Sequence, residues 1–533
     1  MALRRSAVLS VLLAGTLAVP PTLAVGGVPA AGASPAADTA AAVTGFRYVD
    51  ITAGDGVVLK ANVIAPTTPG RHPAIVFVNS WGLNDLEYLA QASAFARRGY
   101  VVLSYTTRGF WGSGGQIDTA GPRDVADVST VLDWLLANTG ADPARVGAAG
   151  VSYGAGISLI ASAFEPRIKS VVAMSGWTDL VASLYGDDTR RPQAVWLLRA
   201  AAQLTGRPSP ELNSLIDSYF ANENLDPLIA WGRVRSAGTY IDAINRNRPA
   251  ILLANSYGDS LFPPNQMADF FGRLTGPKRL ELAPGDHAVA EATGLLGLPN
   301  HIWDSAARWF GRYLAGQQTG IDTEPSVVLR RLNSGAVESY PDWAHVTAST
   351  RRLHLGGARW WDGTGPLSAT AVPGGWSQSI RTGSDTTADG GVVLLSNGLA
   401  SLTGIPPTVW LPTVDRRNAG VWLSDPIWSD GAIRGCPKLH LAVDPSQPKG
   451  TLIAYLYDTD AAGVGRLITH APITWLTGTQ ALNLTLQATA YDVPAGHRLA
   501  LVLDTVDPLY LDANPSGATV TFTAASWFDV PLR

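Results

Sequence analysis

The sequence predicts a doubly wound α/β sheet with an inserted helical cap, followed by an all-β jelly-roll or sandwich domain. Three features predict this architecture. Between about residues 43 and 320, short apolar runs alternate with amphipathic helical stretches, which is typical of a parallel α/β sheet. Residues 178–245 interrupt this alternation with a mostly helical segment. Over residues 325–533, short alternating runs are separated by Gly, Pro, Asp, Asn and Ser, which favours strands and turns.

The expected strands and helices of the first domain follow from their length and periodicity. Residues 46–51 and 57–63 are expected to form a hairpin around Asp55-Gly56, a dipeptide that suits a tight turn. Residues 74–78 form a short, fully apolar run, which is typical of a strand buried on both faces of a sheet. Further strands are expected at residues 100–105, 146–149, 168–174, 251–254 and 280–283. Apolar residues at helical spacing predict helices over residues 86–97, 123–138, 153–163 and 302–314.

The helical segment 178–245 carries several large aromatic residues, among them Trp196, Tyr219, Phe220 and Trp231, and lies between two expected strands of the sheet. We therefore expect it to cover the carboxyl edge of the sheet as a cap. In the second domain, residues 439–443, 452–456 and 499–503 are examples of the short alternating strands.

Composition narrows the classes of function. The chain has 533 residues, of which 46% are hydrophobic and 15% charged, so it is not an intrinsically disordered protein. Its formal net charge of −4 provides no basic surface of the kind that nucleic-acid binding needs, so no nucleic-acid partner is expected. The single cysteine, Cys436, excludes an intramolecular disulfide and a cysteine-rich zinc site.

The N-terminus has the layout of a secretory signal peptide. Two arginines precede an apolar run over residues 7–19, which is too short to span a bilayer, and a stretch rich in Ala, Gly, Pro and Ser extends to residue 42. We expect residues 1–42 to be a signal peptide and flexible leader, cleaved after Ala24 or Ala33. The mature protein is then secreted and has no stable membrane anchor.

Residues 150–154 read Gly-Val-Ser-Tyr-Gly and match G-x-S-x-G, the nucleophile elbow of α/β-hydrolases. In that motif a sharp turn between a strand and a helix lifts the serine hydroxyl above the sheet. The expected strand before Ser152 and the expected helix after it supply this context. Ser152 is therefore the candidate nucleophile.

A serine nucleophile needs a base, and in this fold the acid and then the histidine follow it along the chain. Between the elbow and the end of the first domain there are two histidines, His287 and His301. His287 follows the expected strand 280–283 in a loop, where a catalytic imidazole belongs. His301 opens a helix, where a capping or packing role is expected.

The acid is expected after the preceding strand, which ends near residue 254. Asp259 lies in the loop that follows this strand, where a carboxylate can accept the imidazole N–H and hold the base in the correct tautomer. Asp179 and Asp286 remain alternatives.

Acyl transfer also needs two donors for the oxyanion. The backbone N–H of Tyr153 supplies the first. The second is expected from the loop after strand 74–78, where Trp81 offers its backbone N–H or its indole N–H, or else only forms a wall of the pocket.

No cofactor and no metal are expected. The glycine-rich residues 109–115 fit neither a dinucleotide fingerprint nor a phosphate-binding loop, and we expect them to form a loop at the functional edge of the sheet. Residues 458–460, Asp-Thr-Asp, lack the rest of a calcium loop and favour a hairpin turn.

Several stretches resemble the X-Pro dipeptidyl-peptidase and cocaine-esterase-like family of α/β-hydrolases. In the first domain the similar stretches are residues 107–154, 258–266 and 285–287, and the first of these ends in the nucleophile elbow. In the second domain, residues 454–460 and 493–499 resemble the family's C-terminal jelly-roll domain.

The resemblance implies that Ser152, Asp259 and His287 occupy the family's triad positions. Where the family commonly has a tyrosine that completes the oxyanion hole, this chain has Trp81.

The sequence predicts a secreted serine hydrolase that cleaves an ester or amide of a small molecule or peptide through an acyl-enzyme, with an acyl esterase favoured. An X-Pro dipeptidyl-peptidase is the alternative, and it needs a carboxylate for the free amine of its substrate; the acidic residues of the cap are Asp187, Asp188, Glu211 and Asp217 among others. A non-catalytic protein that binds a glycan or polymer, and an acyltransferase, are the other hypotheses.

Overall fold

The computed structural model describes residues 44–371 and 373–533, and these residues belong to one compact unit. The predicted signal peptide and leader lie outside the described residues. None of the helices in the described part of the chain combines the length and the apolar character that crossing a bilayer requires.

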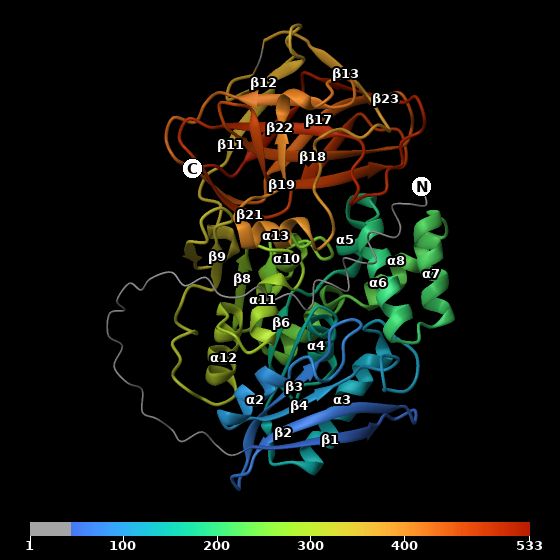
Figure 1. The fold of residues 1–533 in the computed structure, drawn as a ribbon, viewed down its shortest axis with the longest axis vertical. Coiled ribbons are helices and arrows are strands. Elements are labelled where there is room, and N and C mark those ends of the chain that lie inside the picture. Colours follow the sequence, from blue (N-terminus) through green and yellow to red (C-terminus); the bar gives the residue numbers. More distant parts are fainter. Residues whose placement is uncertain (1–43, 372) are drawn as a thin grey trace. The chain divides into compact units, whose positions relative to one another are not determined.

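A ten-stranded sheet forms the centre of the first domain, in the order β1-β2-β4-β3-β5-β6-β7-β8-β9-β10 (Figure 1). Its strands are β1 (Thr44–Thr52), β2 (Val58–Pro66), β3 (His72–Val78), β4 (Val101–Tyr105), β5 (Ala141–Val151), β6 (Ile168–Met174), β7 (Ala250–Ser256), β8 (Lys278–Ala283), β9 (Val327–Arg330) and β10 (Val337–Tyr340). Strands β3 to β9 run parallel to one another in the sheet. The antiparallel pairs β1–β2 and β9–β10 lie at its two edges. This arrangement confirms the predicted doubly wound α/β fold.

Helices cover both faces of this sheet. They are α2 (Leu89–Arg97), α3 (Pro122–Asn138), α4 (Tyr153–Phe164), α10 (Asn265–Arg273), α11 (Val289–Leu295) and α12 (His301–Tyr313). Phe95 of α2 and Trp309 of α12 share one buried cluster, whereas Val128 of α3 and Leu159 of α4 belong to the other. The central helix α4 is buried on all sides up to Ala163 because it lies between the sheet and neighbouring helices.

The cap lies between β6 and β7, as predicted. It consists of α5 (Leu180–Tyr185), the short 3₁₀ helix η1 (Gly186–Asp188), α6 (Pro192–Thr205), α7 (Pro210–Ala221) and α8 (Leu225–Val234), followed by η2 (Ala237–Tyr240) and α9 (Ile241–Asn247). The last of these helices packs back on the α/β core through Ile241 and Ile244. The covering part of the segment is therefore α5 to α8.

In its described residues the C-terminal domain is all-β apart from the helix α13 (Ser396–Thr403) and the 3₁₀ turns η3 (Trp343–His345) and η4 (Leu411–Thr413). Its strands are β11 (Arg351–Leu355), β12 (Thr364–Ser368), β13 (Ser377–Arg381), β14 (Thr408–Trp410), β15 (Gly420–Ser424), β16 (Gly431–Gly435), β17 (Lys438–Pro445), β18 (Gly450–Thr459), β19 (Val464–Trp475), β20 (Ala481–Thr485), β21 (Thr489–Val493), β22 (Arg498–Asp504), β23 (Thr519–Thr523) and β24 (Trp527–Val530). Alternate residues of these strands, such as Leu439, Leu441 and Val443, point into a shared apolar core.

The α/β sheet extends past the domain boundary that the sequence predicted near residues 320–325. Strand β9 pairs in parallel with β8, with Val327 opposite Leu280, and β10 continues the sheet. Strands of only four residues look the same in sequence whichever sheet they join, because the sheet is decided by the partner and not by the pattern. The all-β domain therefore begins after β10.

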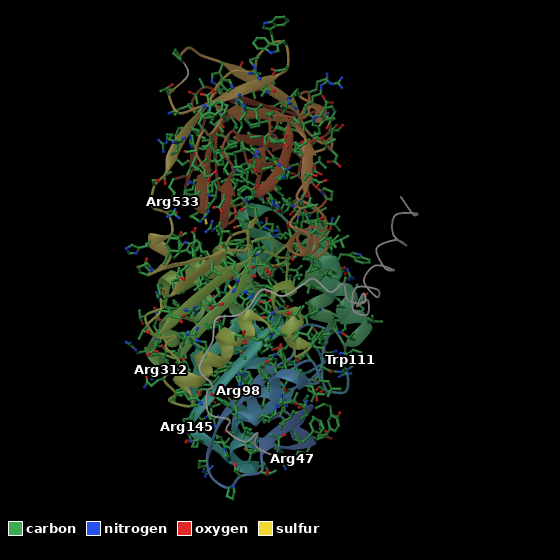
Figure 2. All side chains as sticks on the ribbon, turned by 60° about the vertical axis from the view of Figure 1, so that its left-hand side comes forward. Arg47, Arg98, Trp111, Arg145, Arg312 and Arg533 are labelled. Carbon is green, nitrogen blue, oxygen red and sulfur yellow. The ribbon has the colours of Figure 1, made fainter. Side chains whose placement is uncertain are left out.

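Charged side chains connect the end of this sheet to the C-terminal domain. Glu338 on β10 accepts hydrogen bonds from the Arg434 guanidinium at 2.7 and 2.9 Å, and Arg434 also pairs with Asp492. The hydrogen bond from Arg434 lowers the pKa of Glu338 to about 2. The last residue, Arg533, lies 3.4 Å from the same carboxylate and is labelled in Figure 2.

Candidate active site

Ser152 occupies the sharp turn between β5 and α4. Its φ of 57° is a left-handed conformation that non-glycine residues rarely adopt, and its backbone N–H donates to the Met174 carbonyl on β6 at 2.8 Å. Two residues later, a Cβ on Gly154 would overlap the Val78 carbonyl oxygen of β3, so only glycine fits. The local sequence thus forces helix α4 close to the sheet and holds the serine at its N-terminus.

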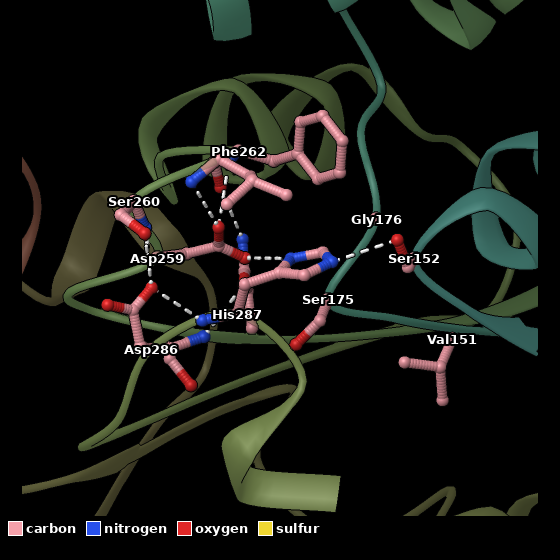
Figure 3. Close-up of polar contacts among 12 residues, drawn as sticks. Val151, Ser152, Ser175, Gly176, Asp259, Ser260, Phe262, Asp286 and His287 are labelled. Atoms are coloured by element: carbon pink, nitrogen blue, oxygen red, sulfur yellow. Dashed lines mark hydrogen bonds and ion pairs between the residues drawn. The ribbon is translucent and has the colours of Figure 1, made fainter. Parts of the chain in front are cut away.

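A continuous line of hydrogen bonds joins Ser152, His287 and Asp259 (Figure 3). The Ser152 Oγ lies 2.8 Å from His287 Nε2, and His287 Nδ1 lies 3.0 Å from Asp259 Oδ2. Each residue follows a different strand of the sheet, β5, β7 or β8, and all three lie at the carboxyl ends of these strands. The structure therefore brings together the three residues that the sequence singled out as nucleophile, base and acid.

The Asp259 carboxylate is fully buried and held by its own loop. Its Oδ1 accepts the backbone N–H groups of Leu261 at 3.0 Å and Phe262 at 2.7 Å. Oδ2 is thereby left to face the imidazole. The Phe262 ring packs edge-on against His287 with centroids 5.1 Å apart, which further restricts the imidazole.

Three carboxyl groups surround His287. Burial disfavours the imidazolium, but the charge and hydrogen bond of Asp259, together with Asp286 and Glu291, outweigh this effect and raise the pKa of His287. Burial raises the pKa of Asp286 to about 6 and that of Glu291 to about 7. Glu291 accepts the hydroxyl of Ser175 at 2.9 Å. The imidazole is thus poised to take up a proton.

The alternative candidates have other contacts. Asp179 caps helix α5 by accepting the Ala182 N–H at 2.9 Å. His301 is the first residue of α12, and burial lowers its pKa to about 4. Asp286 accepts backbone and hydroxyl donors from the two catalytic loops, whereas the His287 imidazole is bonded to Asp259.

The two expected oxyanion donors lie beside Ser152. Within the described part of the chain, the backbone N–H groups of Tyr153 and Trp81 make no hydrogen bond, so both are available. The indole N–H of Trp81 is not, because it donates to the Leu198 carbonyl of α6 at 2.8 Å. This leaves the backbone N–H as the donor that Trp81 can offer, while its ring packs edge-on against Tyr153 with centroids 5.1 Å apart.

Two carboxyl groups, one half-buried and one buried, hold these donors in place, and neither could be found from the sequence. The Glu87 carboxylate accepts the N–H and the hydroxyl of Ser80, and the same hydroxyl bonds to the Val151 carbonyl at 3.0 Å. The Tyr153 hydroxyl donates to Asp124 at 2.5 Å. Isolated acidic residues in loops or helices carry no pattern, so only the folded chain reveals these contacts.

An apolar cavity, partly open to solvent, extends from Ser152 into the cap. Its walls are formed by Trp81, Tyr153, Trp177 and Phe262 and by side chains of α5 to α8, including Leu184, Leu198, Leu212, Ile216, Tyr219 and Trp231. Among the described residues lining it there is no Asp or Glu. The one charged side chain is Arg199, whose guanidinium donates to Asp217 at 2.8 Å.

The two stretches that were compared with cofactor and metal motifs, residues 109–115 and 458–460, form or lead into turns held by hydrogen bonds from backbone N–H groups. The loop 109–115 closes on itself, with the Gly109 N–H on the Gly114 carbonyl at 2.8 Å. Asp460 accepts the N–H groups of Ala462 and Val464 in the turn between β18 and β19. In residues 44–371 and 373–533, no three His, Cys, Asp or Glu residues come together as metal ligands.

Two family models match the chain: the X-Pro dipeptidyl-peptidase (S15 family) model over residues 55–289, and the X-Pro dipeptidyl-peptidase C-terminal non-catalytic domain over residues 319–527. The chain belongs to the S15 family. The two matches together span well over half of the chain and include all three residues of the Ser–His–Asp line.

Curated relatives are distant. A putative Xaa-Pro dipeptidyl-peptidase of Bacillus anthracis is 22% identical over 288 residues, which are 48% of this chain and 46% of that protein. The acyltransferase drtE of Aspergillus calidoustus is 26% identical over 240 residues, 43% of this chain and 74% of that protein. An uncharacterized Escherichia coli protein is 25% identical over 28% of this chain. The chain spans about half the length of several of these relatives, including 53% of the E. coli protein.

Solved structures share the fold over almost the whole chain. A CocE/NonD family hydrolase from Staphylococcus aureus has a TM-score of 0.71 at 12% identity, over 92% of this chain and 94% of that one. An alpha-amino acid ester hydrolase has a TM-score of 0.68 at 17% identity, over 97% of this chain and all of that one (100%). These similarities confirm the predicted combination of an α/β-hydrolase domain with an all-β domain.

Proposed function

We propose that the protein is an acyl esterase that uses Ser152, His287 and Asp259 as its catalytic triad. His287 Nε2 removes the proton of the Ser152 hydroxyl as Oγ attacks the carbonyl carbon of the ester. Asp259 keeps the proton of the neutral imidazole on Nδ1 and stabilises the imidazolium that forms. The backbone N–H groups of Tyr153 and Trp81 receive the oxyanion.

The same groups complete the cycle. His287 returns the proton to the oxygen of the leaving alcohol, and the acyl group remains on Ser152. A water molecule then attacks the acyl-enzyme while His287 takes one of its protons. When the second tetrahedral intermediate collapses, the acid leaves and Ser152 Oγ recovers a proton from His287.

The observation that carries this proposal is the apolar cavity that begins at Ser152. A dipeptidyl-peptidase substrate places a free ammonium group in its binding site, and an ammonium needs a carboxylate partner there. The described lining offers none, and its single charge, on Arg199, has the same sign as the ammonium. An uncharged acyl chain, by contrast, gains about 0.8 kcal/mol for each methylene that it buries.

The acidic residues of the cap that were named as partners for a substrate amine lie elsewhere. Asp217 is bonded to Arg199 and its side chain is 65% exposed. Glu211 lies exposed in the first turn of α7. Asp187 lines a separate cavity between the cap, α10 and the C-terminal domain. None of these three residues lines the cavity at Ser152, and neither does Asp188.

The test compares p-nitrophenyl esters of acetate, butyrate, hexanoate and octanoate with glycyl-prolyl p-nitroanilide and its N-blocked form. We expect ester hydrolysis with kcat/KM rising with chain length, and loss of about 10⁴- to 10⁶-fold in kcat for Ser152→Ala. Preferential cleavage of the free-amine anilide over the esters would instead identify an X-Pro dipeptidyl-peptidase. Equal, background rates for both proteins on every substrate would contradict a catalytic function.

We also propose that the protein is secreted, on the basis of the signal-peptide layout of residues 1–42. Expression of the full chain in its native host, followed by N-terminal sequencing of protein from the culture medium, tests this. The mature protein is expected to begin at Val25 or Ser34. Full-length protein retained in the cells would contradict secretion.

A further inference from the structure

The C-terminal domain reaches the two loops that carry Asp259 and His287. The segment before and within α13 supplies the contacts. The Leu394 N–H donates to the Ser260 hydroxyl at 3.1 Å, and the Asn397 amide donates to the Gly258 carbonyl at 3.0 Å. The residues on either side of Asp259 in the chain are thus bonded to the C-terminal domain.

The same segment also touches the cap and the helix after His287. The Val393 N–H donates to Gln193 on α6 at 3.0 Å. A Cβ on Gly398 would be in ordinary contact with Val289 of α11. Leu394 has a φ of 63°, an uncommon conformation for a branched residue, and its N–H points at Ser260 in this conformation.

Asp286 is the point at which these contacts converge on the histidine. Its Oδ1 accepts the Ser260 N–H at 2.8 Å, the Ser260 hydroxyl at 2.7 Å and the His287 N–H at 2.7 Å (Figure 3). One buried oxygen therefore joins the loop after β7 to the loop after β8. The other oxygen, Oδ2, is buried and has no hydrogen-bond partner among the described residues.

We propose that Asp286 is a positioning residue that fixes His287 relative to Asp259, and that the C-terminal domain sets this geometry through Leu394, Ser260 and Asn397. The inference rests on the proposed esterase function. It gives the C-terminal domain a role in catalysis without any contact with the reacting atoms.

The role of Asp286 depends on an acceptor at Oδ1. In Asp286→Asn the amide oxygen keeps all three donors, and the amide nitrogen replaces an oxygen that has no partner. In Asp286→Ala the three donors lose their acceptor and the two loops lose their connection. Misplacement of a reacting group by about 1 Å costs about 100-fold in rate, so this is the loss of kcat expected for Asp286→Ala.

The experiment measures kcat, KM and the rate at which a fluorophosphonate labels Ser152. Labelling needs the Ser–His pair but no particular acyl substrate, so a failure of the esterase assignment and a failure of this inference give different results. We expect Asp286→Ala to lose about 100-fold in kcat and in labelling rate with KM nearly unchanged, and Asp286→Asn to stay within about fivefold of the wild type.

Ser260→Ala and Asn397→Ala test the link to the C-terminal domain, and each is expected to lower kcat by up to about tenfold. Ser401→Ala is the matched control on α13, because its hydroxyl bonds only to the Gly398 carbonyl of the same helix, and it should keep the wild-type kcat. If Asp286→Ala does not fold, the kcat of Ser260→Ala is compared with that of Ser401→Ala, and equal values would contradict the proposed link between the C-terminal domain and the catalytic loops.

The pH profile separates positioning from charge. The titratable groups that face His287 are Asp259, Asp286 and Glu291, and all three favour its protonated form. Asp286→Asn removes one of these charges, so the acidic limb of kcat/KM should move to lower pH while kcat at the plateau is retained.

Three outcomes would overturn the inference. In the first, Asp286→Ala has a kcat within about threefold of the wild type. In the second, Asp286→Asn is as impaired as Asp286→Ala, so the charge and not the acceptor matters. In the third, KM rises while kcat is unchanged, which would place the effect in substrate binding.

Discussion

Asp259→Asn is the substitution that examines the triad most directly. Oδ1 of Asp259 accepts two backbone N–H groups, from Leu261 at 3.0 Å and Phe262 at 2.7 Å. An amide NH₂ at that position would face two donors, so the amide oxygen of asparagine must occupy it. The NH₂ group then points at His287 Nδ1 and donates to it.

This hydrogen bond reverses the tautomer of His287. With Nδ1 acting as an acceptor, the neutral imidazole carries its proton on Nε2, which lies 2.8 Å from Ser152 Oγ and can no longer take the serine proton. An aspartate-to-asparagine change of this kind in a Ser–His–Asp triad costs roughly 10⁴-fold in kcat. At about 1.36 kcal/mol for each factor of ten, this is a loss of about 5.4 kcal/mol in transition-state stabilisation. Folding should change little, because the two backbone hydrogen bonds remain.

The assay follows p-nitrophenyl ester hydrolysis at saturating substrate, with circular dichroism and a thermal melt to establish that the variant folds. Asp179→Asn is the matched control, because Asp179 caps α5 and makes no contact with His287. The reasoning is refuted if Asp259→Asn retains more than about a tenth of the wild-type kcat while Asp286→Asn loses about 10³-fold or more. That pattern would identify Asp286 as the acid.

Three further predictions concern pH, stability and the cavity. Because the base must be neutral and the pKa of His287 is raised, the acidic limb of the kcat/KM profile should have its midpoint above the usual 6.5, and a midpoint below that value would contradict the electrostatic account. Burial raises the pKa of Glu87 from 4.5 to about 7, so on raising the pH the Glu87 carboxyl keeps its proton longer in the folded state than in the unfolded state. The free energy of unfolding that this group contributes is therefore present below pH 4.5 and is lost by about pH 7, a change of about 3 kcal/mol. Urea unfolding at several pH values should show a smaller decline for Glu87→Gln than for the wild type, and identical declines would refute the assignment. Ile216→Trp should fill part of the cavity and lower kcat/KM on octanoate by about tenfold or more relative to acetate, whereas Leu204→Trp, at an exposed position on α6, should leave the ratio unchanged.

Much of the fold was predictable because its signals are local. The buried strands β3 and β7 contain continuous apolar runs, and α3 repeats apolar residues at helical spacing. The pairing of the short strand β9 with this sheet could not be predicted, because four residues do not reveal their partner. Its place in the sheet depends on pairing with β8, which lies more than forty residues earlier in the chain.

The site residues likewise divide into those that a local sequence pattern predicts and those that only the folded chain identifies. The turn around Ser152 has its own sequence pattern because the backbone there needs small residues, so the candidate nucleophile could be found without a structure. The choice of His287 and Asp259 used the fixed order of the fold along the chain. The choice between the indole and the backbone of Trp81 could not be made, because it depends on the Leu198 carbonyl of the cap.

The sequence by itself therefore determined the fold class and the candidate nucleophile, because strand periodicity and tight-turn chemistry are properties of neighbouring residues. Only the tertiary structure decided which carboxyl group faces His287, what lines the cavity above Ser152, and that α13 contacts the catalytic loops. These contacts join residues that lie tens to hundreds of positions apart, such as Ser260 and Leu394. They exist because the packing of two domains brings those segments together, and no local pattern encodes that approach.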